Sequence, residues 1–153
     1  MSYFVIEPKD YNLRFMRKTA KLEYYLGLDY GRSKVGLAVA DSETKIAFAH
    51  KTIYNNKNFI ETLRGIVKEE QIDRIIIGKL NYAGENKKAF EAEEIGETLE
   101  KELGIAVEYQ EEMFSTKMAE NNLKERGAKK IKKLDNQEAA RIILQSWLDK
   151  SEK

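Results

Sequence analysis

The stretch LGLDYGRSKVGLAVAD, residues 26–41, decides the fold. It contains two apolar runs, and the first of them holds a single carboxylate, Asp29. The apolar pattern before and after Gly31 predicts two strands, residues 24–30 and 34–41, joined by a connection of hairpin length. Asp29 lies near the carboxyl end of the first strand. A charge in a half-buried strand is costly unless something pairs with it, so Asp29 needs either a structural partner or a chemical role.

The strand pattern continues beyond this stretch and then gives way to a helical period. A third strand over about residues 45–54 would complete an antiparallel meander of three short-looped strands. Two later strands are predicted at residues 73–78 and 105–109. Helices are predicted over about residues 59–70, 85–103, 115–126 and 135–150, and Gly104 suits the end of the second of them. This order of elements predicts an α/β fold, a mixed five-stranded sheet with helices on both faces.

The chain is expected to form one compact domain. Its 153 residues are in the range of a single domain, and the sequence contains neither an internal repeat nor a low-complexity segment. Residues 1–23 mix charges with scattered aromatic residues and show no clear period. We therefore expect an N-terminal extension over residues 1–23 and a domain over residues 24–150.

Composition excludes several kinds of site. The chain has no cysteine and one histidine, which rules out disulfides, thiolate metal sites and histidine clusters. The formal net charge is +1, so any binding of nucleic acid must come from local patches. No stretch approaches the roughly 18 apolar residues of a membrane span, and the first 23 residues lack the apolar core of a secretory signal. We expect a cytoplasmic protein without a membrane partner.

Carboxylates from three distant segments are predicted to meet at one edge of the sheet. Asp29 ends the first strand, Glu111 and Glu112 follow the fifth, and Asp135 begins the last helix. Ligands of such sheets collect at the carboxyl ends of the strands. Oxygen ligands without cysteine or histidine suit Mg²⁺ or Mn²⁺. Two such ions about 4 Å apart can activate water and stabilise a leaving oxygen, which is the chemistry of phosphodiester hydrolysis.

Each carboxylate also has a structural explanation. Asp29, which precedes Gly31, could be a turn aspartate that bonds its own backbone. The paired glutamates 111 and 112 could be solvated loop charges. Asp135 with Glu138 has the form of a capping box, and by itself this position is more often a cap than a metal ligand.

Four segments of the chain together resemble the motifs of the YqgF family, also called RuvX, and they occur in family order: LGLDYGRSKVGLAVAD, IIIGKLNYAGE, EEMFSTKMAE and KLDNQEAARIILQSWL. They span residues 26–148. The resemblance implies a ribonuclease H-like fold with strand order 3-2-1-4-5. It also implies a bacterial cytoplasmic nuclease that trims the 5′ end of the 16S ribosomal RNA precursor. The family's other label, Holliday junction resolvase, rests on similarity of fold to a junction-cutting enzyme.

The resemblance also assigns residues to the site. It implies that Asp29, Glu112 and Asp135 are the catalytic residues and the ligands of Mg²⁺ or Mn²⁺. The middle motif of the family carries an arginine where this chain has Met113. Substrate contacts are predicted for a set of polar and basic residues, of which the lysines at 130 and 133 could also belong to a solvated face: Arg32, Lys79, Asn81, Lys117, Lys130 and Lys133.

Three functions compete at this point. The first is a metal-dependent endonuclease that acts on pre-ribosomal RNA, with branched DNA as the alternative substrate, in a monomer or weak homodimer. The second, motivated by Met113, is an RNA-binding or ribosome-associated module that cuts poorly. The third takes GLDYG, residues 27–31, as the phosphate loop of a sugar kinase or actin-like ATPase, but such proteins need two domains around a cleft, and this chain supplies one.

Overall fold

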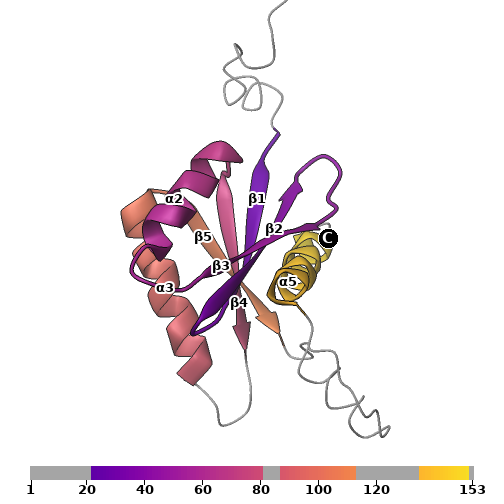
Figure 1. The fold of residues 1–153 in the computed structure, drawn as a ribbon. Coiled ribbons are helices and arrows are strands. Elements are labelled where there is room, and N and C mark those ends of the chain that lie inside the picture. Colours follow the sequence, from indigo (N-terminus) through magenta and orange to yellow (C-terminus); the bar gives the residue numbers. More distant parts are fainter. Residues whose placement is uncertain (1–21, 81–86, 113–134, 152–153) are drawn as a thin grey trace, which may run out of the picture.

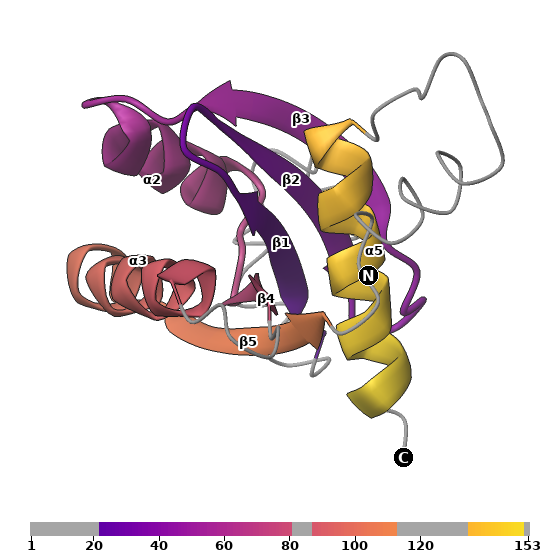
Figure 2. The same ribbon diagram turned by 90° about the horizontal axis from the view of Figure 1, so that it is seen from below.

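The computed structural model describes residues 22–80, 87–112 and 135–151, without the side chains of residues 80, 87–90 and 112. A five-stranded sheet of order β3-β2-β1-β4-β5 forms the middle layer, which confirms the predicted strand order. Helices α2 and α3 cover one face and α5 covers the other (Figures 1 and 2). The strands are β1 (Tyr24–Tyr30), β2 (Lys34–Asp41), β3 (Phe48–Tyr54), β4 (Arg74–Leu80) and β5 (Ala106–Glu112), and the helices are α2 (Phe59–Glu69), α3 (Lys87–Leu103) and α5 (Asn136–Ser151).

The direction of the strands determines where their ends meet. Strands β1, β2 and β3 form the predicted antiparallel meander, whereas β4 runs parallel to β1 and β5 runs parallel to β4. The carboxyl ends of β1, β4 and β5 therefore lie at one edge of the sheet, and α5 begins near this edge (Figure 1). Ligand sites of α/β sheets form at such an edge.

Side-chain alternation divides the apolar residues of β1 between two cores. Leu26 and Leu28 are fully buried in the core beneath α2 and α3. Tyr25 belongs to the second core, beneath α5, where its ring lies 4.8 Å from the ring of Trp147 in an edge-to-face arrangement. Because neighbouring strand residues face opposite ways, Asp29 belongs to the α5 face of the sheet.

Helix α5 approaches its face of the sheet closely because the strand residues there are small. A Cβ atom added at Gly27 would lie 2.8 Å from the Cβ of Leu144, which is closer than side chains pack. On β2 the buried residues Ala38 and Ala40 belong to the same core. The sequence between residues 35 and 40 thus alternates larger residues for the α2 and α3 side with small residues for the α5 side.

The third strand begins at Phe48, and the prediction of a start near residue 45 is wrong. The carboxylate of Asp41 accepts hydrogen bonds from the backbone N–H groups of Glu43 and Thr44, at 3.0 and 2.7 Å, and so closes a turn. Lys45 follows in a left-handed conformation, with φ of 55°. The chain is therefore still turning where the apolar pattern predicted a strand.

Strands β4 and β5 extend further than the predicted ends at residues 78 and 109. The two strands remain paired through Lys79 with Glu111 and Leu80 with Glu112. Lys79 and both glutamates are consequently strand residues and not loop residues. The predicted helix over residues 115–126 and most of the predicted N-terminal extension lie outside the described residues.

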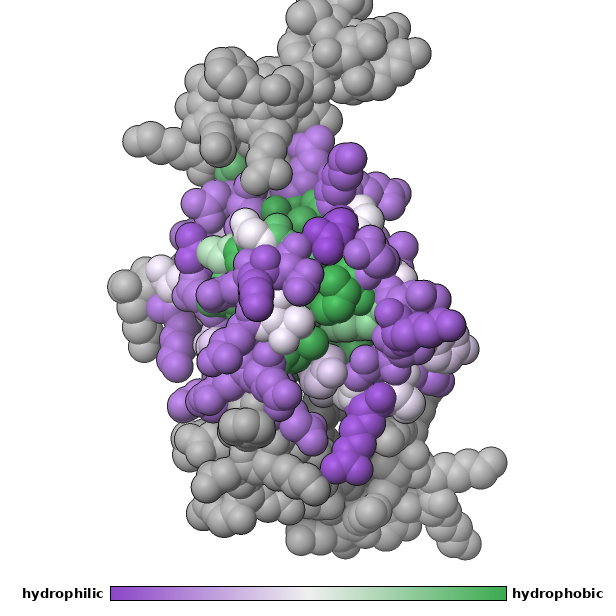
Figure 3. Space-filling view, turned by 90° about the vertical axis from the view of Figure 1, so that its left-hand side faces the viewer, coloured by the Kyte–Doolittle hydropathy of each residue, from purple (hydrophilic) through white to green (hydrophobic). Residues whose placement is uncertain are grey.

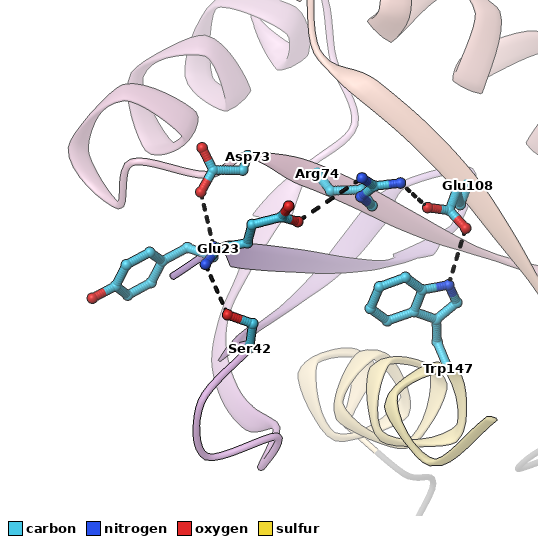
Figure 4. A network of polar contacts seen from close by, with 7 residues as sticks. Glu23, Ser42, Asp73, Arg74, Glu108 and Trp147 are labelled. Carbon is cyan, nitrogen blue, oxygen red and sulfur yellow. Dashed lines mark hydrogen bonds and ion pairs between the residues drawn. The ribbon is translucent and has the colours of Figure 1, made fainter. Parts of the chain in front are cut away.

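A polar network ties the strands together at the opposite edge of the sheet (Figure 4). Arg74 on β4 pairs with Glu108 on β5 and lies 3.9 Å from Glu23, and the indole N–H of Trp147 on α5 donates to Glu108 at 3.4 Å. The hydrogen bond from Arg74 to Glu108 raises the pKa of the guanidinium. The network joins the residue before β1 to β4, β5 and α5 on the α5 side of the sheet. No helix in the described part of the chain is long and apolar enough to cross a bilayer.

Replacing Gly104 by Ala should lower the free energy of unfolding by about 1 kcal/mol, because Gly104 has a φ of 61°, which strains any residue that carries a Cβ. The free space around its Cβ position leaves the backbone as the only cost. Thermal unfolding measures the effect, which should be a decrease of a few degrees. Gly65→Ala is the matched control, since that position is equally open but lies inside α2, where alanine should raise the melting temperature. Equal shifts of the same sign would contradict the prediction.

Candidate active site

Asp29 is a strand residue and not the turn aspartate of the alternative interpretation. It lies in β1, is half-buried, and pairs across the antiparallel ladder with Gly36 of β2. The β1–β2 connection begins only after Tyr30. The carboxylate is therefore held by a sheet, on the α5 face, at the edge where β1, β4 and β5 end.

Gly36 brings the start of α5 to Asp29. A Cβ atom at Gly36 would overlap the backbone carbonyl of Asn136 and would lie 2.7 Å from the backbone nitrogen of Gln137. The first residues of α5 thus rest directly on the β2 backbone, across the ladder from Asp29. Asp135 immediately precedes these residues and is exposed. Asp29 and Asp135, the first and the last predicted acidic residues, therefore belong to neighbouring backbone segments at this edge of the sheet.

The end of β5 reaches the same edge. The register aligns Leu28 with Ile77 of β4 and Gly78 of β4 with Gln110 of β5, so position 112 lies just beyond the level of Asp29. Glu108 contacts Trp147 on α5, and position 112 follows it by an even number of residues. By strand alternation, position 112 shares the α5 register with Asp29, whereas position 111 belongs to the α3 register. This register favours Glu112 over Glu111.

Asp135 occupies the position before the first residue of α5, where a cap would stand. Its carbonyl oxygen accepts the first helical hydrogen bond, from the N–H of Ala139 at 3.0 Å. The carboxylate of Glu138, the other half of the predicted capping box, accepts from Nε of Arg141 at 2.8 Å, and this bond lowers the pKa of Glu138. Glu138 is thus already bonded within its own helix.

Sequence comparison decides the family. Residues 23–150 match the family described as "RuvX: Holliday junction resolvase". This chain belongs to the RuvX family. The resemblance found in the four sequence motifs is thereby confirmed.

Relatives of this RuvX protein are similar over nearly their whole length. Proteins named "Putative pre-16S rRNA nuclease" from Anaeromyxobacter sp. strain Fw109-5 and from Dictyoglomus thermophilum are each 34% identical to it, with alignments covering 82% of this chain and 96% and 95% of those proteins. The relative of that name in Thermosynechococcus vestitus is 36% identical over 81% of this chain and 86% of its own length.

Two solved structures share the ribonuclease H-like fold of RuvX at low sequence identity. Thermus thermophilus RuvC in complex with a Holliday junction substrate has a TM-score of 0.54 and 16% identity, over 85% of this chain and 96% of RuvC. The fowlpox virus resolvase, bound to Holliday junction DNA, has a TM-score of 0.54 and 12% identity, over 85% of this chain and 99% of the resolvase. The predicted fold class is confirmed by these likenesses and by the strand order.

The side chains at the edge where β1, β4 and β5 end suit a hard divalent cation. Asp29 and Asp135 offer carboxylate oxygens, the ligands that Mg²⁺ and Mn²⁺ prefer. Among the side chains that the structure describes, no three His, Cys, Asp or Glu residues form a metal-binding group. The third predicted ligand, Glu112, is described only by its backbone, so its part in the site stays a prediction.

The six predicted substrate contacts of this chain fall into three groups: one near the strand end that carries Asp29, one away from it, and four outside the described residues. Arg32 is exposed in the β1–β2 connection, one residue beyond Gly31. Lys79 lies on the α3 face and pairs with Glu93, so the structure does not bring it to Asp29. Four predicted contacts, and Met113 with them, lie outside the described residues: Asn81, Lys117, Lys130 and Lys133.

The contribution of Gly36 to the site was missed in the sequence. Its role depends on the carbonyl of Asn136, which is 100 residues away in the chain. The only local signal was the run of small residues at alternate positions 36, 38 and 40, which indicates a closely packed helix but does not identify it.

Proposed function

We propose that this protein is a metal-dependent endonuclease that hydrolyses phosphodiester bonds in nucleic acid. The observation that carries the proposal is the seating of the start of α5 on Gly36 of β2, which pairs with Asp29 of β1 and lies directly beneath the helix start that follows Asp135. Glu112 would complete the ligand set from the end of β5. We infer that the nuclease domain covers residues 24–150, preceded by an extension over residues 1–23.

Asp29 and Asp135 hold negative charge at fixed positions because one is in a sheet and the other precedes a packed helix. Divalent ions bound there would lower the pKa of water and stabilise the leaving oxygen of the phosphodiester. The N-terminus of α5, at the same edge, carries the positive end of the helix dipole and suits a phosphate group. Arg32, exposed in the β1–β2 connection that follows Asp29, would contact the substrate.

The preferred substrate is the 16S ribosomal RNA precursor, trimmed at its 5′ end in the cytoplasm. The names of the relatives support this choice, since three of them, from three different bacteria, are named pre-16S rRNA nucleases. A four-way DNA junction is the second candidate, favoured by the description of the matching family. A monomer or weak homodimer would suffice, because the proposed ligands all come from one chain.

Removal of divalent ions should abolish cleavage. Labelled precursor RNA and a four-way DNA junction are incubated with the full-length protein in Mg²⁺, in Mn²⁺ and in excess chelator. We expect RNA cleavage with either ion, products with 5′-phosphate and 3′-hydroxyl ends, and no cleavage in chelator. Cleavage of the junction alone would replace the substrate assignment. Binding of RNA without cleavage under every condition would contradict the nuclease and favour an RNA-binding module.

A further inference from the structure

A hollow of about 350 Å³ lies on the α3 face, at the same edge of the sheet as Asp29. Figure 3 looks onto this side of the molecule, where hydrophilic residues predominate and hydrophobic areas are visible between them. The volume is at the lower end of the range of small-molecule sites, about 300–1,000 Å³. The hollow is lined by Tyr30, Arg32, Asn55, Glu91, Glu94, Ile95 and Thr98.

One wall of the hollow is fixed by contacts of its own. Tyr30 follows Asp29 directly, and its ring packs edge-to-face on Phe59, with 5.9 Å between the ring centroids. The side-chain amide of Asn55 donates to the carbonyl of Gly31 at 2.7 Å, which ties the end of β3 to the β1–β2 connection. These contacts hold the Tyr30 and Asn55 side of the hollow in place.

The lining combines an aromatic surface with acceptors for hydrogen bonds. Tyr30 and Ile95 offer apolar contact to a flat ring. Glu91 and Glu94 lie one helical turn apart on α3 and accept hydrogen bonds from N–H groups, whereas Arg32 donates. Two carboxylates against one guanidinium would repel a phosphate group from the interior. A nucleobase that carries neighbouring N–H donors and a carbonyl acceptor would be favoured.

We propose that this hollow binds an unpaired guanine of the strand that is cut at Asp29. The inference rests on the proposed nuclease function. Consecutive Cα atoms are 3.8 Å apart and their side chains face opposite sides of a strand, so Asp29 and Tyr30 stand back to back at one edge. A nucleic-acid strand that crosses this edge can leave its phosphate on the α5 face and turn a neighbouring base into the hollow. Guanine matches the lining, because N1–H and the exocyclic amine face the carboxylates while O6 accepts from Arg32. Unpaired bases are commonly bound by stacking and by contacts to this edge.

The test measures binding of short single-stranded oligonucleotides in chelator, where no cleavage occurs. Fluorescence anisotropy compares pyrimidine strands with one central guanine, adenine or inosine, as RNA and as DNA, on the full-length protein. Hydrogen bonds to charged groups predict about tenfold tighter binding of guanine than of adenine. Inosine, which lacks the exocyclic amine, should lose several-fold of this preference. Equal preference in RNA and DNA would place recognition in the base alone.

Two substitutions remove the acceptors of the half-buried Glu91 and the exposed Glu94 from α3, where alanine is well tolerated. Glu91→Ala combined with Glu94→Ala should abolish the preference for guanine, while the exposed Glu97→Ala on the same helix should retain it. Equal affinity for all bases in the wild type, or a preference that survives the double substitution, would overturn the guanine site while leaving the nuclease intact. A protein that neither binds nor cleaves any nucleic acid would overturn both proposals.

Discussion

Replacement of Asp29 by Asn is expected to reduce cleavage by at least about a hundredfold, since even the loss of a group that only supports a metal ligand costs roughly 10- to 100-fold. The amide keeps the shape of the carboxylate but lacks the charge that holds a divalent ion. Asp29 is half-buried within β1, so a substitution of similar size should leave the fold intact. Initial cleavage rates in Mg²⁺ and Mn²⁺ measure the effect, and thermal unfolding verifies the fold.

Asp149→Asn is the control for this experiment. Asp149 is exposed near the end of α5, where it accepts a hydrogen bond from Gln145, and its neutralisation should leave the rate unchanged. A loss of activity confined to Asp29 would identify that carboxylate as part of the site. Full activity of Asp29→Asn would remove it from the mechanism and with it the proposed ligand set.

The second large effect is expected from Gly36→Ala, which adds one methyl group to the strand beneath the start of α5. The new Cβ would overlap the carbonyl of Asn136, so α5 must shift and Asp135 must move with it. Overpacking of this kind costs about 1–3 kcal/mol. We expect a lower melting temperature together with a loss of cleavage, measured on the same preparation below the unfolding transition.

Gly27→Ala is the control that separates the loss of stability from the loss of cleavage. This glycine also lies beneath α5, but a Cβ there would meet the Cβ of Leu144 and the carbonyl of Ala140, which lie further along the helix than the residues next to Asp135. It should lower stability to a similar extent and retain more activity than Gly36→Ala. Equal activity in the two variants at equal stability would show that the seating of Asp135 is not required for cleavage.

The predicted strand bounds agree best with the structure where the apolar pattern of the sequence indicates that one or both faces of the strand are buried. The bounds of β1 and β2 were predicted correctly, because apolar residues there repeat at a spacing that only a strand can bury. The start of β3 was predicted too early, because the hydrogen bonds of Asp41 hold the chain in a turn that continues to the left-handed Lys45. The ends of β4 and β5 were predicted too early, because pairing between them extends into charged residues such as Glu111.

The residues of the candidate site could likewise be predicted only where a local pattern in the sequence singled them out. Asp29 could be singled out from the sequence, since a lone carboxylate in an apolar strand is costly unless it has a role. The expected phosphate contact of Lys79 had no such support, and its ion pair with Glu93 depends on α3 packing beside β4. The hollow beside Tyr30 could not be predicted at all, because its walls come from β1, the β1–β2 connection, the residue after β3 and α3.

By itself the sequence determined the fold class and the family, because hydrophobic periodicity and the choice of residue type act locally along the chain. Tertiary structure alone decided which of these residues meet. The parallel register of β1, β4 and β5 places position 112 on the same face as Asp29, and the missing side chain at Gly36 lets α5 begin there. Such contacts arise when distant segments pack, and no local pattern of residues specifies them.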